Sequence, residues 1–263
     1  MKIAAVVLAL ALAAPAAAQE RDYCPARPGL GTPACTIAPG RVSVETSIAD
    51  WERDEGADQR SDTSLFGDTV VRVGLADTIE GIAGWTPVGI ARERDKMTGT
   101  TDRSTAVGDA YLGLKANLAH PDGSGFSFAV QPFATLPVGR SPIGAGDWGA
   151  GLLAPLSYDL AGGVNVQLTP EVDAAVDEDG SGRHLAYSAV AGVEVPFTKT
   201  LSATGEVQAL RDQDPSGRST QTFAALSLAW MANDDFQVDA GCVAGLNHSA
   251  PGARLYAGLS RRF

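Results

Sequence analysis

The sequence predicts an all-β protein, a transmembrane antiparallel up-and-down β-barrel of about 12 strands. Apolar and polar residues alternate at every second position through most of the chain, as in strands with one face in oil and the other in water. The chain begins with a secretory signal, and no later segment approaches the roughly 20 consecutive apolar residues that a membrane-spanning helix needs. If the chain crosses a membrane, it must do so with strands.

The first 18 residues have the composition of a signal peptide. Lys2 precedes an apolar run, and a stretch of small residues ends at Ala18. We therefore expect residues 1–18 to be removed by cleavage after Ala18.

Residues 19–40 are rich in proline and show no strand pattern. Because an exported chain enters an oxidising compartment, we expect Cys24 and Cys35 to form a disulfide. We expect this segment to lie in the periplasm, where it covers or enters the mouth of the barrel. Cys242 is left as the odd thiol, and its position on the apolar side of a strand predicts an inert, lipid-facing residue.

Residues 41–263 form the expected barrel. Clusters of Gly, Pro, Asp and Asn separate segments of barrel-crossing length, and an even number of strands suits a closed bacterial barrel. The expected strands cover residues 42–51, 64–75, 79–92, 107–118, 126–136, 148–160, 164–176, 185–197, 201–210, 220–230, 236–246 and 254–263.

The connections between these strands predict the orientation of the barrel. Tight turns, such as 76–78 and 232–235, alternate with longer and more charged connections. Since outer-membrane barrels have short periplasmic turns, we expect both termini in the periplasm. The expected external loops are 54–62, 95–104, 138–146, 177–183, 212–219 and 247–252.

Aromatic residues support a lipid-facing wall. On the outward set of one strand, Trp148 and Tyr158 are separated by about the 9–11 residues that a tilted strand needs to cross a bilayer. Two aromatic residues with this spacing would lie at opposite membrane interfaces. A soluble sandwich also alternates, but it needs no such aromatic ends.

The inward register carries more acids than bases. In a dry core these carboxylates would each cost several kcal/mol unless paired, so the pattern implies a hydrated interior or a salt-bridged plug. A narrow cation-favouring pathway and a closed, charge-paired interior both remain open. The lumen-lining candidates, beside Glu45 and Gln208, are Asp68, Arg72, Glu80, Asp109, Tyr111, Lys115, Gln131, Phe133, Glu171, Asp173, Glu194, Glu206, Asp239, Arg254 and Tyr256.

Several motifs resemble one known family. The strand Gly108 to Lys115, the turn Leu136 to Arg140 and the terminal Phe263 occur in the order found in an outer-membrane family of transporters assigned to the phenol meta-cleavage pathway. The resemblance covers the chain from about Pro28 onward. It implies a porin or transporter, with small hydrophobic or aromatic molecules as solutes, and assembly by the barrel-assembly machinery through the Phe263 strand. Arg261 departs from the apolar or aromatic residue usual at that position.

The motifs for catalysis, metals and cofactors lack the structural context that they need, so we expect no enzyme, cofactor or dedicated metal site. Acids such as Asp179, Asp212 and Asp214 nevertheless gather on one rim, where divalent ions could bridge them to anionic lipid head groups. His184 and Ser188 would lie about 13 Å apart along one strand, which excludes a direct pair. The glycines of residues 144–149 match a dinucleotide fingerprint, but an alternating strand follows them instead of a helix. The acidic loop 177–182 lacks the downstream Glu of a calcium loop and is expected to be a solvated hairpin loop.

Three functions remain, all in the bacterial outer membrane. A channel or transporter for small solutes, surrounded by outer-membrane lipid, is the first. A structural or surface-interaction barrel with a closed lumen is the second, and a lipid-modifying enzyme is the third. The net charge of −11, with no clusters of Lys and Arg, argues against nucleic acid as a partner.

Overall fold

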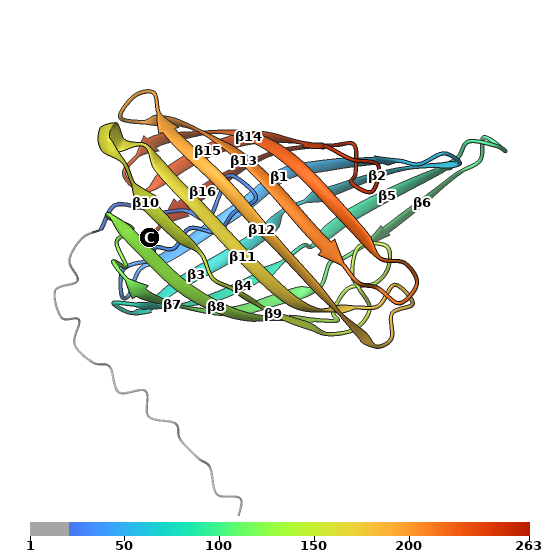
Figure 1. The fold of residues 1–263 in the computed structure, drawn as a ribbon, viewed down its shortest axis with the longest axis horizontal. Coiled ribbons are helices and arrows are strands. Elements are labelled where there is room, and N and C mark those ends of the chain that lie inside the picture. Colours follow the sequence, from blue (N-terminus) through green and yellow to red (C-terminus); the bar gives the residue numbers. More distant parts are fainter. Residues whose placement is uncertain (1–20) are drawn as a thin grey trace, which may run out of the picture.

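The structure is a computed structural model that describes residues 21–263, so the expected signal peptide lies outside the described residues. Sixteen strands form a single antiparallel sheet (Figure 1). The strands are β1 (Val42–Glu55), β2 (Gln59–Phe66), β3 (Asp68–Ala76), β4 (Ile79–Trp85), β5 (Val88–Asp95), β6 (Thr101–Ala106), β7 (Ala110–Ala119), β8 (Phe126–Leu136), β9 (Gly149–Leu153), β10 (Leu156–Asp159), β11 (Asn165–Val176), β12 (Arg183–Pro196), β13 (Leu201–Asp212), β14 (Ser219–Asn233), β15 (Phe236–Gly245) and β16 (Ala253–Arg262).

Pairing of β16 with β1 closes the sheet into a barrel, which confirms the predicted fold. The sixteen strands make 12 crossings, because four crossings are each divided in two: β2 with β3, β4 with β5, β6 with β7, and β9 with β10. Pro87 and Pro155 lie in two of these breaks, where the missing N–H group interrupts the ladder. Gly67, in a third, has a φ of 70° and lies against Pro87.

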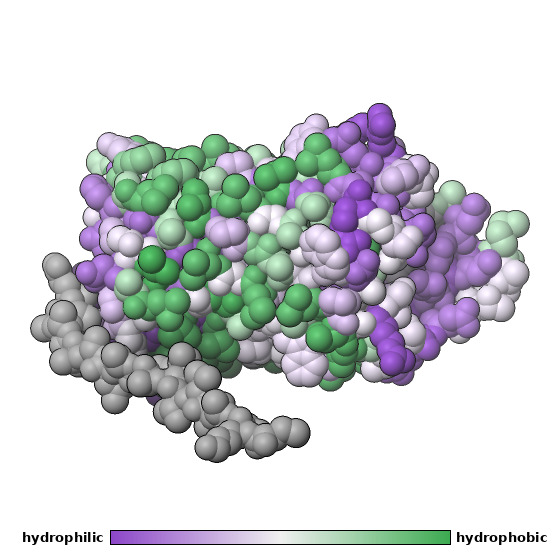
Figure 2. Space-filling view, turned by 90° about the horizontal axis from the view of Figure 1, so that it is seen from below, coloured by the Kyte–Doolittle hydropathy of each residue, from purple (hydrophilic) through white to green (hydrophobic). Residues whose placement is uncertain are grey.

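The outer wall of the barrel is apolar. Along β14, Leu226, Leu228 and Trp230 are each about half exposed, whereas Ser227 between them is 1% exposed. Figure 2 shows apolar residues spread over the side of the barrel and polar residues gathered toward the end that carries the long loops. A soluble monomer rarely exposes so continuous an apolar surface, because burying it would be favourable.

One region differs from the sequence prediction. The expected loops 54–62 and 95–104 are mostly strand, because β1, β2, β5 and β6 continue beyond the rim as a projecting arm (Figure 1). Charge pairs hold this arm, since Asp62 of β2 binds Arg53 across the strands and Arg60 within its own strand. The many charges of these segments had indicated loops, although charged residues also suit a sheet with water on both faces.

The two ends of the barrel are distinct. The end with the tight turns, here called the tight-turn end, also holds Phe263, and the opposite end carries the projecting arm and the long loops (Figure 1). A short 3-10 turn, η1 (Ala161–Gly163), lies between β10 and β11. Within residues 21–263, no helix is long and apolar enough to cross a membrane.

Residues 21–37, here called the plug, enter the barrel from the tight-turn end. The structure confirms the predicted disulfide between Cys24 and Cys35, whose Cα atoms are 6.6 Å apart. Ala34 and Cys35 are almost fully buried although they lie in no strand, because the barrel wall surrounds them.

Candidate functional site: a plugged lumen

The inner wall binds the plug mainly through its backbone. Three wall carboxylates accept hydrogen bonds from plug N–H groups at 2.7 to 3.0 Å. Each carboxylate satisfies backbone donors that would otherwise be buried without a partner. Glu45 binds the N–H groups of Ala26 and Arg27, Glu206 binds those of Leu30 and Gly31, and Glu80 binds that of Ile37.

Two wall cations complete this layer. Arg72 lies between Glu45 and Glu80, at 3.0 and 2.9 Å, and Lys115 lies 3.2 Å from Glu80. All four side chains are at most 1% exposed. These charges therefore neutralise one another in a dry layer, and the acids of this layer do not line an open cation pathway.

The same cations also hold the plug by its carbonyl groups. Arg72 donates to the Cys24 carbonyl at 2.8 Å, and Lys115 donates to the Pro33 carbonyl at 2.9 Å. Backbone donors and acceptors of the plug are thus both matched by ionised side chains, whose hydrogen bonds are stronger than neutral ones.

The opposite wall holds the plug by side chains. Arg27 pairs with Asp239 at 2.8 Å, and its guanidinium lies 5.6 Å from the centre of the Tyr256 ring. Leu30 packs on an apolar cluster that contains Tyr256 and Val243. The plug therefore contacts both sides of the lumen.

A polar cavity of about 840 Å³ remains at the tight-turn end, between the plug and the wall formed by β10 to β14. Gln167, Glu194 and Thr204 are among the wall residues that line it. Of the predicted lumen candidates, Glu194 lines this cavity.

The remaining predicted candidates have separate positions. Asp68 accepts a hydrogen bond from Thr86 beside the strand breaks. Asp109 accepts the N–H groups of Gly139 and Ala145 and so fixes the loop that follows β8. Arg254 pairs with Asp50 toward the long-loop end.

A second group of candidates lies beyond the plug. Tyr111 and Phe133 stack with ring centres 5.1 Å apart, and the amide of Gln131 donates to the Tyr111 hydroxyl at 2.8 Å. Glu171 and Asp173 face the lumen from β11 and are only half-buried. Among the described residues, neither carboxylate has a salt-bridge partner, in contrast to Glu45 and Glu80.

Sequence reasoning missed several polar residues that bind the plug. Thr169 binds the Thr32 N–H at 3.0 Å, Asn117 donates to the Ala34 carbonyl at 2.8 Å, and Gln237 donates to the Arg27 carbonyl at 2.9 Å. Their inward register was the available signal. The sequence alone, however, does not indicate which uncharged lumen residues bind another segment of the chain.

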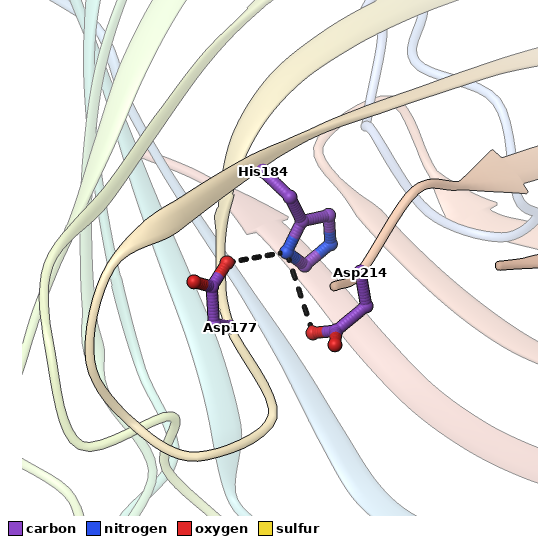
Figure 3. Close-up of side chains that lie close together, drawn as sticks. All are labelled: Asp177, His184 and Asp214. Carbon is purple, nitrogen blue, oxygen red and sulfur yellow. Dashed lines mark hydrogen bonds and ion pairs between the residues drawn. The ribbon is translucent and has the colours of Figure 1, made fainter. Parts of the chain in front are cut away.

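His184, Asp177 and Asp214 form a separate cluster at the long-loop rim (Figure 3), and Asp212 lies beside them. The His184 Nδ1 atom lies 2.9 Å from Asp177 and 3.4 Å from Asp214, and its Nε2 atom lies 2.9 Å from Asp212. Burial lowers the pKa of His184, but the hydrogen bond with Asp177 and the charges of Asp212 and Asp214 outweigh it, so the pKa lies above its ordinary value. Through these contacts His184 links the loop after β11 to the loop after β13.

This rim cluster also contains a donor set for a metal ion. One atom from each of Asp177, His184 and Asp214 lies within 4.8 Å of the others. The sequence prediction considered His184 only as a catalytic base and assigned no metal. The His184 ring lies between these carboxylates and in its charged form attracts them, which offsets part of their negative charge.

Comparison with known proteins gives a sequence family and similar folds. A family described as "Putative MetA-pathway of phenol degradation" matches residues 26–263. No curated protein gives a significant match.

Among solved structures, a KdgM porin superposes with a TM-score of 0.54 at 9% identity, covering 84% of this chain and 99% of that chain. The transport unit of the autotransporter AIDA-I from Escherichia coli superposes with a TM-score of 0.50 at 7% identity, covering 84% and 89%. At these identities the similarity shows the fold alone.

Proposed function

The chain belongs to this phenol-degradation family, and on that premise we propose that it is an outer-membrane channel or transporter for small solutes whose lumen is gated by the plug. One observation carries the proposal: an apolar barrel wall encloses a polar interior that is blocked by a separate segment instead of by the wall itself. A barrel with a structural role alone needs no removable segment. A barrel of 12 strands lies between filled 8-stranded barrels and open porins, so removal of the plug would leave a narrow passage.

The orientation follows the rule for bacterial barrels. The tight-turn end and both ends of the mature chain lie in the periplasm, and the projecting arm lies outside the cell. The plug therefore closes the periplasmic half. Residues 1–18 act as the export signal, and the strand that ends at Phe263 is read by the assembly machinery.

Small hydrophobic or aromatic molecules are the proposed solutes, from the family description and from the stacked aromatic pair in the lumen. No catalytic role is proposed. Ser188 is buried in the wall opposite Glu171, and the contacts of His184 are to aspartates.

The test is conductance in planar lipid bilayers. The full chain is expected to give low conductance, and deletion of residues 21–37 is expected to raise it by about tenfold or more. Heat-dependent mobility on a gel establishes that the deleted form still makes a barrel. Cys242→Ala is the control, since that residue lies outside the lumen.

A second candidate is the closed structural or surface-interaction barrel. It is favoured by the number of charged contacts that fix the plug to both sides of the lumen. If the deleted form folds and still conducts nothing, the channel proposal is wrong and this alternative takes its place.

A further inference from the structure

Two lumen carboxylates lack the plug N–H partners that Glu45, Glu80 and Glu206 have. Glu171 and Asp173 lie two residues apart on the inward face of β11, within hydrogen-bonding range of each other. Within residues 21–263, no Arg, Lys or His lies at salt-bridge distance from either of them, and the Oδ1 atom of Asp173 is buried without a hydrogen-bond partner. Two like charges this close favour a cation or a proton between them.

The absence of a side chain at Gly151 lets an aromatic ring approach this acid pair. Gly151 of β9 lies between Phe133 and Asp173 in the sheet register. A methyl group at Gly151 would overlap both the Phe133 ring and the Asp173 carboxylate, so glycine lets these two side chains meet above the strand without displacement. Phe133 in turn stacks on Tyr111.

A third acceptor completes the arrangement. Gln131 is 5% exposed, and while its amide nitrogen donates to Tyr111, its Oε1 atom has no partner. A buried carbonyl oxygen without a donor costs free energy that a bound donor would recover. The free polar atoms here are thus acceptors, beside two aromatic faces.

We propose that Tyr111, Gln131, Phe133, Glu171 and Asp173 form a binding site for a small organic cation with an aromatic body, such as a protonated primary amine. The ammonium group donates to the carboxylates and to Gln131, which satisfies the acceptors and neutralises the acid pair. The ring packs on Tyr111 and Phe133. A neutral phenol offers one donor and no charge, and a carboxylate is repelled.

The position of the site links it to the plug. Thr169, the previous inward residue of β11, binds the plug at Thr32. Tyr111, Phe133 and both acids remain partly exposed, so a solute in the lumen reaches them without the plug leaving. The inference rests on the proposed function only in taking the lumen as the path of a solute.

The test is calorimetric titration of the full-length protein in detergent with benzylamine, phenol and benzoate. Benzylamine is expected to bind at least tenfold more tightly than phenol, and benzoate is expected not to bind. The double variant Glu171→Gln, Asp173→Asn is expected to weaken benzylamine binding at least tenfold. Glu194→Gln is the matched control, because it removes a carboxylate from the separate cavity at the tight-turn end.

The outcomes separate the hypotheses. Equal binding of phenol and benzylamine overturns the cation assignment, and equal losses in the double variant and in Glu194→Gln overturn the site. Phe133→Leu provides a second variant that keeps both charges, and it is expected to weaken benzylamine binding about threefold to tenfold. Because binding is measured without transport, a silent channel would overturn the proposed function and leave this result standing.

Discussion

The lumen contains two groups of carboxylates with opposite surroundings. Glu45 and Glu80 are at most 1% exposed and are surrounded by Arg72, Lys115 and plug N–H groups. Glu171 and Asp173 are half-buried, and they lie beside each other, Ser188 and a pair of aromatic rings. Both groups lie on inward positions of the sheet, so the alternation alone does not distinguish them. The difference indicates that one group holds the protein's own chain and the other is left for a solute.

The largest expected effect compares the same substitution in the two groups. Glu80→Gln leaves Arg72 and Lys115 buried with one carboxylate between them, so we expect the free energy of unfolding to fall by about 3 kcal/mol. Glu171→Gln removes a charge that has no cationic partner, and we expect a change within about 0.5 kcal/mol. Urea unfolding in micelles, followed by tryptophan fluorescence, measures both. Equal losses would remove the distinction between the groups.

Reduction of the disulfide tests the plug side of the comparison. Cys24 and Cys35 close a short loop, with a sequence separation of 11, inside the lumen. Opening it increases the entropy of the undocked plug, which weakens docking by about 2 to 3 kcal/mol. Amide hydrogen exchange in residues 21–37 is expected to accelerate in reductant, with Cys242→Ala as the background that excludes the free thiol. Unchanged exchange would mean that the wall contacts alone fix the plug.

Ion selectivity tests the solute side. In the form that lacks residues 21–37, Glu171 and Asp173 attract cations into a narrow passage whose low-dielectric walls focus the electric field. Replacing both with their amides is expected to lower the ratio of cation to anion permeability severalfold, as read from the reversal potential in a salt gradient. Glu194→Gln in the same deleted form should have a smaller effect, because Glu194 lies near the mouth. If Glu194→Gln lowers the ratio as much, the acid pair is not the selective point.

The smallest expected effect concerns the rim, outside both groups. The pKa of His184 lies above its ordinary value of 6.5, so its contribution to stability is fully present below pH 6.5 and is lost as the pH rises through the folded-state pKa. We expect a loss of up to about 1 kcal/mol, measured as a lower Tm at high pH, which His184→Asn abolishes. Asp179→Asn, in the same loop, is the control. A zinc-dependent rise in Tm at high pH, lost in His184→Asn, would instead indicate a metal site.

Much of the barrel follows from the sequence, but some boundaries do not. Pro87 and Pro155 mark two breaks that a reading of proline positions could have found. The projecting arm was expected as loops, because its charges resemble those of solvated connections. Its strands depend on pairs such as Arg53 with Asp62, which become visible only when β1 and β2 are aligned.

The wall layer of charges is an intermediate case. Glu80 lies opposite Lys115 in the register of β4 and β7, and Ser43, two residues before Glu45, lies opposite Arg72 in that of β1 and β3. An alignment of the predicted strands could therefore have paired these charges. It could not have shown that residues 21–37 lie among them, since the plug is bound mostly by its backbone.

The sequence by itself determined the closed sheet, its apolar outer surface and the side of each strand that faces inward. The reason is that, for strands with a two-residue alternation, a closed barrel is the arrangement that keeps every backbone group hydrogen-bonded in lipid. Tertiary structure alone decided what each inward carboxylate meets. Almost every residue carries the same backbone N–H group, so the sequence of the plug does not indicate which N–H groups Glu45, Glu80 and Glu206 bind. Only the path of the plug through the barrel separates the acids that it contacts from Glu171 and Asp173, which it does not contact.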